Sequence, residues 1–333
     1  MRLIAVGTSA GGVRALRTVL GGLPGDFDAA VLVVIHLAPS SPGYLPEIFS
    51  RAGPLPCLHP EQGQRLQRAH VYVAPPDQHM LVDGRCVIRL SRGPKENRAR
   101  PAVDPLFRSA ALAYGPRVIA AVLTGDLDDG TSGMLAVKLC GGTTVIQDPT
   151  DAEAPSMPSS AARHVQIDHQ VPIAAMASLL VRLTKEKAGP ERHAMPRRPN
   201  IETEVAVHAG SVLYEVPRYG DPSIFTCPDC HGTLMRIRDE HLLRFRCHTG
   251  HAFTSQSLLA ALNEVTEDAV CSAVRALQEG AMLLEHLAWH ARDADQPVAG
   301  GALEREAVRK LQQADKIRTS IMLPPRADKI ADA

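Results

Sequence analysis

The chain has 333 residues, of which 36 are Lys or Arg and 36 are Asp or Glu, so its formal net charge at pH 7 is zero. This length suggests about two domains, and the balanced charge excludes a global electrostatic attraction to nucleic acid or anionic lipid. Seven cysteines, three of them in one cluster, do not suit a disulfide framework, and no apolar run reaches the length of a membrane span or a signal-peptide core. We therefore expect a soluble, cytoplasmic protein without a nucleic-acid partner or membrane insertion.

The first predicted strand, residues 3–6, leads at once into the glycine- and serine-rich run GTSAGG at 7–12. This corner turns the chain into a helix predicted over residues 13–20. Glycines allow close backbone approach there, and the first N–H groups of a helix have no intrahelical partner. Residues 7–11 fit the G-x-S-x-G pattern, in which the serine is a nucleophile. Ser9 is therefore a candidate nucleophile, with a phosphate-binding corner or a simple turn as the alternative.

Short apolar runs alternate with amphipathic stretches from residue 2 to about residue 184, which is typical of βαβ units. The runs are rich in Val, Ile, Leu and Ala, as in parallel strands buried on both faces. We predict an α/β fold with a doubly wound, mostly parallel sheet. Further strands are expected at 30–35, 71–74, 118–123 and 143–146, further helices at 105–114, 132–139 and 173–183, and a β-hairpin on an edge at 79–90.

Two more reactive residue types follow predicted strands at their carboxyl ends, where functional groups gather in open α/β sheets. His36 comes directly after the strand at 30–35 and is the best candidate base for Ser9. The alternative is a loop histidine whose hydrogen bonds are structural only. Asp129 follows the strand at 118–123 and is the candidate orienter of that base. Because Asp126 and Asp128 share its loop, helix capping or a Mg²⁺ site is a second interpretation. Jointly, the three corners favour a Ser-His-Asp hydrolase.

Five stretches carry a family resemblance: the GTSAGG run, HLAP at 36–39, VAPPDQH at 73–79, RPAVDPLF at 100–107 and the segment 123–134. In this order they resemble the CheB-type protein-glutamate methylesterases of chemotaxis. The resemblance covers residues 2–184 and implies a Rossmann-like esterase domain with Ser9 as nucleophile, His36 as base and Asp129 as orienter. It also implies hydrolysis of glutamate γ-methyl esters, and deamidation of particular glutamines, on chemoreceptor-like signalling proteins, with no catalytic cofactor.

Two features depart from the usual pattern of that family. Members usually carry Gly-Met-Gly where this chain has Gly125-Asp126-Leu127, which places a carboxylate near the expected oxyanion donors at Ala10 and in the Gly125 loop. Asp126 either points to solvent or marks a different substrate choice. Many members also place a receiver domain before the esterase, whereas the first strand here starts at residue 3, so we expect a receiver-less enzyme. The alternative function is a catalytically impaired scaffold or binding module of a chemosensory pathway.

A compact Cys/His cluster follows the esterase-like part. Cys227 and Cys230 form a Cys-x₂-Cys pair, and Cys247 and His251 form a Cys-x₃-His pair after two predicted hairpin strands at 234–237 and 242–245. This spacing is typical of a zinc ribbon, so these four residues are the predicted ligands of a structural Zn²⁺. His231 and His248 are the substitutes. The cluster and the long helix after it are also similar to a C-terminal extension of some receiver-less CheB-type proteins.

The chain thus divides into four predicted parts: an esterase domain at 1–184, a linker at 185–224, a zinc ribbon at 225–254 and a helical hairpin at 255–333. The linker includes the basic, proline-rich run MPRRP at 195–199, read as a solvated connector or a contact for an acidic partner. The hairpin has one helix from 256 to about 291 and another after Gly300-Gly301. A stripe of Leu, Val and Ala at helical spacing is expected to pack inside the hairpin, with a partner or self-association surface as the alternative. Its members on the first helix are Leu258, Leu259, Leu262, Val265, Ala269, Ala273, Leu277, Leu284 and Leu287.

Overall fold

The computed structural model describes residues 1–189, 203, 206, 220–237 and 242–322. They belong to two compact units, Met1–Leu259 and Ala260–Ala333. The run at 195–199 of the predicted linker lies outside the described residues. Within the described ranges, no helix is both long and apolar enough to cross a bilayer.

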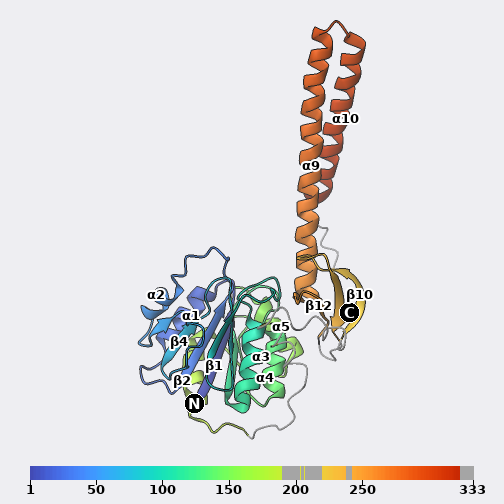
Figure 1. Ribbon diagram of the computed structural model, residues 1–333. Helices are drawn as coiled ribbons and strands as arrows, with labels where there is room; N and C mark the ends of the chain where they lie inside the picture. Colours follow the sequence, from blue (N-terminus) through green and yellow to red (C-terminus); the bar gives the residue numbers. More distant parts are fainter. Residues whose placement is uncertain (190–202, 204–205, 207–219, 238–241, 323–333) are drawn as a thin grey trace. The chain divides into compact units, whose positions relative to one another are not determined.

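A seven-stranded parallel sheet forms the centre of the first unit (Figure 1). The strand order is β3-β4-β2-β1-β7-β8-β9, so the chain winds outward from β1 to one side and then to the other. This confirms the predicted α/β fold and all five predicted strands of the sheet. β3 and β9 escaped prediction because two or three residues are too short for a periodic signal. The strands are β1 (Arg2–Thr8), β2 (Ala29–Ile35), β3 (Cys57–Leu58), β4 (His70–Val73), β7 (Val118–Val122), β8 (Thr143–Gln147) and β9 (His169–Val171).

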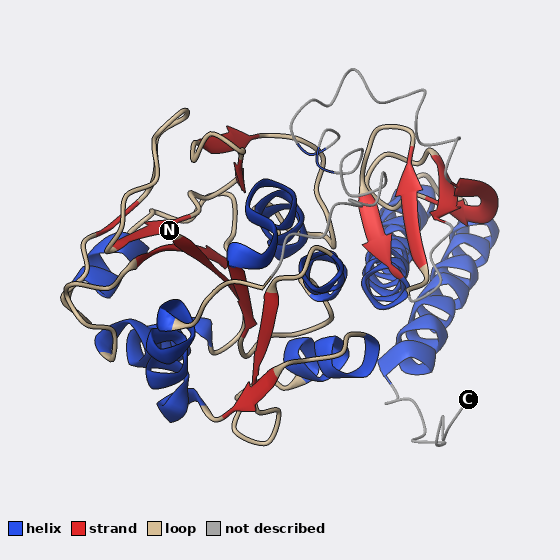
Figure 2. Cartoon of the chain, turned by 90° about the horizontal axis from the view of Figure 1, so that it is seen from below, coloured by secondary structure: helices blue, strands red, loops and turns tan. Residues whose placement is uncertain are grey.

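Helices cover both faces of this sheet (Figure 2). Successive strand residues point to opposite faces, so Leu3 and Ala5 join one core while Ile4 and Val6 join the other. This is why the strand sequences are continuously apolar. The four predicted helices form within two residues of their expected ends. One face carries α1 (Gly12–Gly21), α2 (Leu45–Ser50) and α6 (Ile173–Lys185), and the other carries α3 (Val103–Tyr114), α4 (Thr131–Leu139) and α5 (Ser156–His164).

The hairpin predicted at 79–90 forms, but its expected place on an edge of the main sheet was wrong. Its strands, β5 (His79–Val82) and β6 (Ile88–Ser91), make a separate two-stranded sheet. Met80 and Ile88 pack into the same core as α3, and the Val82 N–H donates to Ser109 Oγ of that helix at 3.1 Å. The hairpin is therefore held by burial against a helix rather than by pairing with the parallel strands.

A second sheet, with four antiparallel strands, is the last sheet of the first unit in chain order. Its order is β10 (Gly220–Thr226), β11 (Thr233–Ile237), β12 (Arg244–Cys247) and β13 (Ala252–Thr254). β11 corresponds to the predicted strand at 234–237. The second predicted strand is shifted by two residues, so that Cys247 ends β12. β10 starts inside the stretch 185–224 that the sequence indicated as linker.

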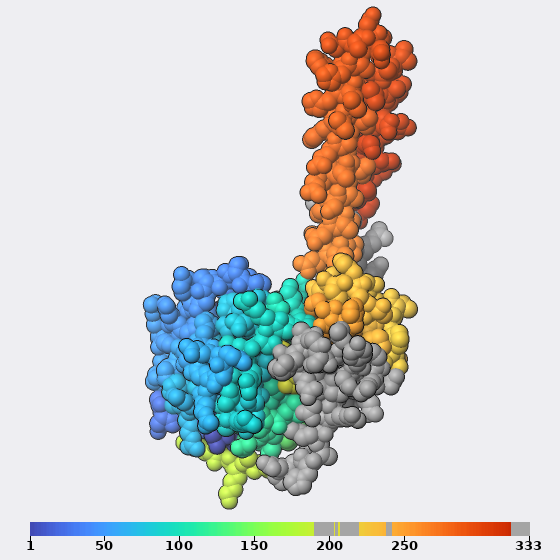
Figure 3. Space-filling model, viewed as in Figure 1, coloured from blue at the N-terminus to red at the C-terminus, as the bar shows by residue number. Residues whose placement is uncertain are grey.

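The C-terminal helices, orange to red in Figure 3, are α9 (Ser255–Asp293) and α10 (Pro297–Met322). The second helix starts earlier than predicted, because Pro297 suits a first helical turn and the two glycines lie inside the helix. Only part of the predicted stripe is covered: Leu258 is buried and Leu277 and Leu284 are half-buried, whereas Leu259, Val265 and Leu287 are exposed. Small residues bring two helices close together and leave larger side chains on the flanks. The buried positions along the hairpin include Val274, Ala281, Ala288, Gly300, Ala307 and Ala314.

Candidate active site

The corner at the carboxyl end of β1 presents Ser9. Gly11 has a φ of 75°, in the left-handed region that side chains with a Cβ rarely adopt. The Ser9 N–H donates to Thr124 O at 3.0 Å, and Thr124 Oγ1 donates to Ala10 O at 2.9 Å. Thr8 Oγ1 also donates to Thr124 O, at 2.6 Å. The main chain on both sides of the serine is thus held by the loop that follows β7.

The three residues predicted to form a triad leave the sheet from three adjacent strands. β2 pairs with β1 in a register that sets Thr8 opposite Ile35, so Ser9 and His36 follow neighbouring strand ends. β7 pairs with β1 on its other side and leads to Asp129. His36 Nε2 donates to Asp129 Oδ2 at 2.7 Å. In the described part of the chain the only hydrogen bond of the His36 side chain is this one, so a bond between Ser9 Oγ and His36 is not formed.

Asp129 is held by more than His36. Its side chain is 2% exposed and accepts hydrogen bonds from the N–H groups of Val103 at 2.6 Å and Asp104 at 3.2 Å. These N–H groups belong to the first turn of α3, where helix donors are free and the dipole favours an anion. Asn97 Nδ2 adds a fourth donor at 2.9 Å. Burial opposes ionisation, but the bonds from His36, Val103 and Asn97 hold the pKa of Asp129 below its ordinary value.

The three carboxylates of the loop after β7 do not converge, which argues against the Mg²⁺ interpretation. Asp126 is exposed and thus faces solvent. Asp128 Oδ1 accepts a hydrogen bond from Thr254 Oγ1 at 2.7 Å, and burial raises the pKa of Asp128 to about 6. Among the residues described, no group of His, Cys, Asp and Glu spaced for a metal includes this loop. The geometry around Asp129 instead fits an orienter of His36.

The loop that should supply an oxyanion donor departs from the expectation in detail. A Cβ at Gly125 would lie 2.9 Å from Ser9 Cβ, so only glycine fits against the serine. The Gly125 N–H already donates to Ala154 O at 2.8 Å, so it cannot bind an oxyanion as well. Leu127, which stands where the family usually has glycine, has a φ of 62°. This φ lies in the left-handed region, which costs a side chain with a Cβ about 1–2 kcal/mol.

Cys227, Cys230, Cys247 and His251 come together at one end of the four-stranded sheet, with their candidate ligand atoms all within 4.8 Å of one another. His251 Nδ1 lies 3.7 Å from Cys227 Sγ and 3.6 Å from Cys247 Sγ, and Cys230 Sγ lies 3.6 Å from Cys247 Sγ. A tetrahedral Zn²⁺ with ordinary bond lengths requires edges of about 3.5–3.8 Å. The donor set and its spacing therefore fit zinc. The predicted substitutes, His231 and His248, are exposed and lie outside this group.

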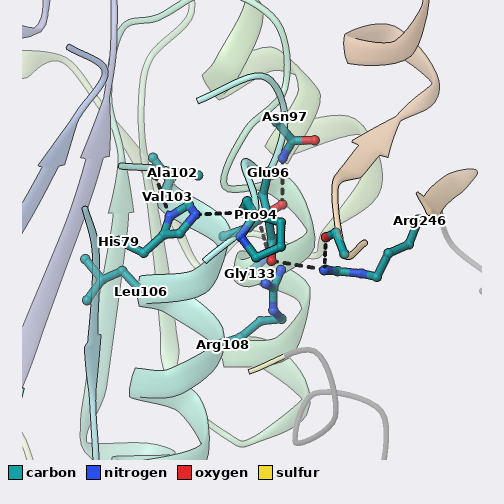
Figure 4. A network of polar contacts seen from close by, with 12 residues as sticks. His79, Pro94, Glu96, Asn97, Ala102, Val103, Leu106, Arg108, Gly133 and Arg246 are labelled. Carbon is teal, nitrogen blue, oxygen red and sulfur yellow. Dashed lines mark hydrogen bonds and ion pairs between the residues drawn. The ribbon is translucent and has the colours of Figure 1, made fainter. Parts of the chain in front are cut away.

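Sequence reasoning missed a group of buried polar residues around Glu96, which Figure 4 shows. Glu96 lies between two guanidinium groups, with Oε2 2.7 Å from Arg108 Nη2 and Oε1 3.1 Å from Arg246 Nη2. All three side chains are buried. Burial by itself would raise the pKa of Glu96, but the two cations outweigh it and lower the pKa to about 2. No local signal could have revealed this, because a polar run such as KENR at 95–98 is typical of a solvated loop.

Comparisons with known proteins show which family the first part of the chain resembles in sequence and fold. The model of the CheB methylesterase family matches residues 4–180, just over half of the chain. A protein of Leptospira interrogans, provisionally named a protein-glutamate methylesterase/protein-glutamine glutaminase, is 34% identical over 180 residues, which are 54% of this chain and 93% of that protein. Two proteins named protein-glutamate methylesterase/protein-glutamine glutaminase, from Methanosarcina mazei and Xanthomonas campestris, are 35% and 37% identical over 190 residues. These matches cover 55% and 56% of this chain. The chain spans about half of the length of each of these two relatives, 52% in both cases.

Among solved structures, the Thermotoga maritima CheB methylesterase catalytic domain matches with a TM-score of 0.53 and 31% identity. This match covers 55% of the present chain and 98% of the Thermotoga chain. It extends the likeness from sequence to fold.

Proposed function

The chain belongs to the CheB methylesterase family, and we propose that it hydrolyses glutamate γ-methyl esters on chemoreceptor-like signalling proteins and deamidates particular glutamines there. The observation that carries this proposal is the 2.7 Å hydrogen bond between His36 and a buried, ionised Asp129, next to the Ser9 corner. The names of the relatives support both reactions.

In the proposed mechanism, Asp129 holds the imidazole through Nε2, which leaves Nδ1 of His36 to take the Ser9 proton. Ser9 Oγ attacks the γ-carbonyl carbon, and the tetrahedral intermediate collapses to an acyl-enzyme while methanol leaves with the proton from His36. Water then gives a proton to His36 and attacks the acyl carbon, and the bond to Ser9 Oγ breaks as His36 returns this proton to the serine, which releases the glutamate product. In deamidation, ammonia takes the place of methanol. The Ser9–His36 bond has to form when substrate is bound, as apo geometries often require.

The oxyanion of the tetrahedral intermediate needs backbone donors near Ser9. The Ala10 N–H, just before α1 begins, is the predicted donor that remains, and the helix dipole favours negative charge at this end of the helix. A second donor has to come from Asp126 or Leu127, since Gly125 is engaged. Removing one such donor typically costs about 3–4 kcal/mol of transition-state stabilisation.

The test is methanol release from a methyl-esterified chemoreceptor fragment, measured together with labelling of Ser9 by a serine-directed phosphonate. An active methylesterase should release methanol and react with the phosphonate. Labelling without methanol release would indicate an esterase with another substrate. A protein that does neither would be the scaffold or binding module considered as the alternative.

We further infer that Cys227, Cys230, Cys247 and His251 hold one structural Zn²⁺. Thiolate ligands and a closed set of four leave no open position for a substrate, so the metal would stabilise the four-stranded sheet and take no part in ester hydrolysis. The fit of the ligand spacing to a tetrahedron supports this assignment. The hydrogen bond with Cys247 and burial raise the pKa of the Cys227 thiol, a barrier to ionisation that a bound cation would remove.

Freshly purified protein should contain about one equivalent of zinc, the amount expected for a single closed site. Cys247→Ser should lose most of this metal, because the serine hydroxyl is a poor zinc ligand. The matched control is Cys271→Ser, which changes an exposed cysteine on α9 outside the cluster. Elemental analysis by mass spectrometry measures both. A wild-type zinc content far below one equivalent, or no change in Cys247→Ser, would count against the site.

A further inference from the structure

Asn97 contacts Asp129 at the carboxylate oxygen that does not face His36. It lies in a tight turn closed by the Ala99 N–H, which donates to Glu96 O at 2.9 Å. Its φ of 50° is one that asparagine adopts more readily than most residues. Asn97 Nδ2 donates to Asp129 Oδ1 at 2.9 Å and to Asp104 Oδ2 at 3.0 Å. An amide nitrogen has two protons, so both are used on carboxylates. The Oδ1 atom of Asp129, opposite the oxygen that faces His36, is therefore held by Asn97.

The other end of the Asn97 side chain is held by the C-terminal part of the first unit. Its Oδ1 accepts hydrogen bonds from the Thr254 N–H at 3.2 Å and from Ser257 Oγ at 3.1 Å. The Asn97 N–H donates to Ala252 O at 2.8 Å. Because carboxylates accept while Thr254 and Ser257 donate, only one orientation of the amide satisfies both sides. Residues 252–257, far outside the matched range 4–180, thus decide which way Asn97 points.

The same segment makes a second connection to the loop of Asp129. Thr254 Oγ1 donates to Asp128 Oδ1 at 2.7 Å, and Asp128 immediately precedes Asp129. Nearby, Arg246 Nη1 donates to Gly250 O at 2.8 Å while its Nη2 pairs with Glu96, the neighbour of Asn97 (Figure 4). All of these polar side chains are buried, so each bond is made in a low dielectric and leaves an unsatisfied group when broken.

We propose that residues 252–257 are a positioning element of the catalytic centre, which holds Asp129 in line with His36 through Asn97 and Asp128. The inference rests on the proposed function of Ser9, His36 and Asp129, and goes beyond it by making the C-terminal part of the chain necessary for turnover. None of these residues touches substrate; they act through Asp129. Displacing a catalytic group by about 1 Å can cost on the order of 100-fold in rate.

The experiment follows the reaction of Ser9 with a fluorophosphonate in the full-length protein and separates the maximal rate, kinact, from the binding constant, KI. Thr254→Val is nearly isosteric but removes the hydroxyl donor to Asp128. We expect kinact to fall about tenfold or more with KI within about twofold, because only alignment is changed. Thr254→Ser, which keeps the hydroxyl, should restore most of the rate. Asn97→Gly tolerates the positive φ, lacks the amide and should lower kinact by a similar factor.

The double variant Asn97→Gly/Thr254→Val shows whether the two residues act as one element. If the two residues are coupled, kinact of the double variant falls by about the larger of the two single factors. If they are independent, the two single factors multiply. Circular dichroism gives the folded fraction, and Asn97→Gly carries the test if Thr254→Val does not fold. The inference is overturned if kinact of folded variants stays at the wild-type value, or if the losses multiply. A wild-type protein that does not label would instead refute the proposed function.

Discussion

Replacing Ser9 by alanine should lower kcat for methyl ester hydrolysis by about 10⁴-fold or more, because the nucleophile of the proposed triad is lost. KM should change little, since the serine hydroxyl contributes mainly to the transition state. The residual rate would come from substrate binding and backbone donors alone, which the substitution leaves in place. Methanol release from a methylated receptor fragment measures the effect.

Ser40→Ala is the matched control for this substitution. Ser40 is exposed in the loop that follows His36, so its hydroxyl lies near the site in sequence without a place in the proposed chemistry. Its rate should equal that of the wild type. Methanol release that survives Ser9→Ala unchanged would exclude Ser9 as the nucleophile.

Replacing Glu96 by alanine should lower the free energy of unfolding by about 3–5 kcal/mol or more, because removing one partner of a buried ion pair leaves its counterpart uncompensated. Here two cations, Arg108 and Arg246, lose their shared carboxylate at once. Urea denaturation measures the change. The control is Glu153→Ala, whose pair with Arg14 at 2.8 Å is exposed (52% and 80% for the two side chains). Such a surface pair contributes about 0–1 kcal/mol, so a similar loss in both variants would contradict the prediction.

Glu96 should also make the first unit sensitive to acid. Its pKa is lowered from 4.5 to about 2 in the folded protein, so the folded state binds this proton less readily than the unfolded chain. The stabilisation is complete above pH 4.5 and is lost as the pH falls toward 2, by about 3 kcal/mol in total. Glu96→Gln, neutral and nearly isosteric, should lack this part of the pH dependence. Parallel stability curves for both proteins below pH 5 would contradict the assignment.

The parallel sheet was predictable because strands buried on both faces are apolar without interruption, as in the run of β2 from Ala29 to Ile35. The positions of Ser9, His36 and Asp129 followed from a general rule: groups that end neighbouring parallel strands meet at one edge of the sheet. The spacing of Cys227, Cys230, Cys247 and His251 likewise predicted a cluster that the chain brings together. Each of these signals can be recognised from residue types and spacings along the sequence, without knowledge of the tertiary contacts.

The seam of the C-terminal hairpin needed the tertiary structure. Leu287 and Ala288 are adjacent on α9, and hydrophobicity favours the leucine as the buried residue. The close approach of α10 leaves room for the alanine only, so Ala288 is buried and Leu287 is exposed. The separation of two helix axes is a property of both sequences together and cannot be read from one of them.

By itself, the sequence determined the α/β class of this protein, the strand ends that carry the candidate catalytic residues and the Cys/His spacing. Only the tertiary structure decided that Glu96 and Asn97 are buried and that residues 252–257 contact Asn97 and Asp128, which flank Asp129. The physical reason is that a polar side chain is stable inside a protein only when partners satisfy it. Glu96 pairs with Arg246, and Asn97 accepts a hydrogen bond from Thr254. Both partners lie about 150 residues further along the chain, so no local sequence pattern predicts these contacts.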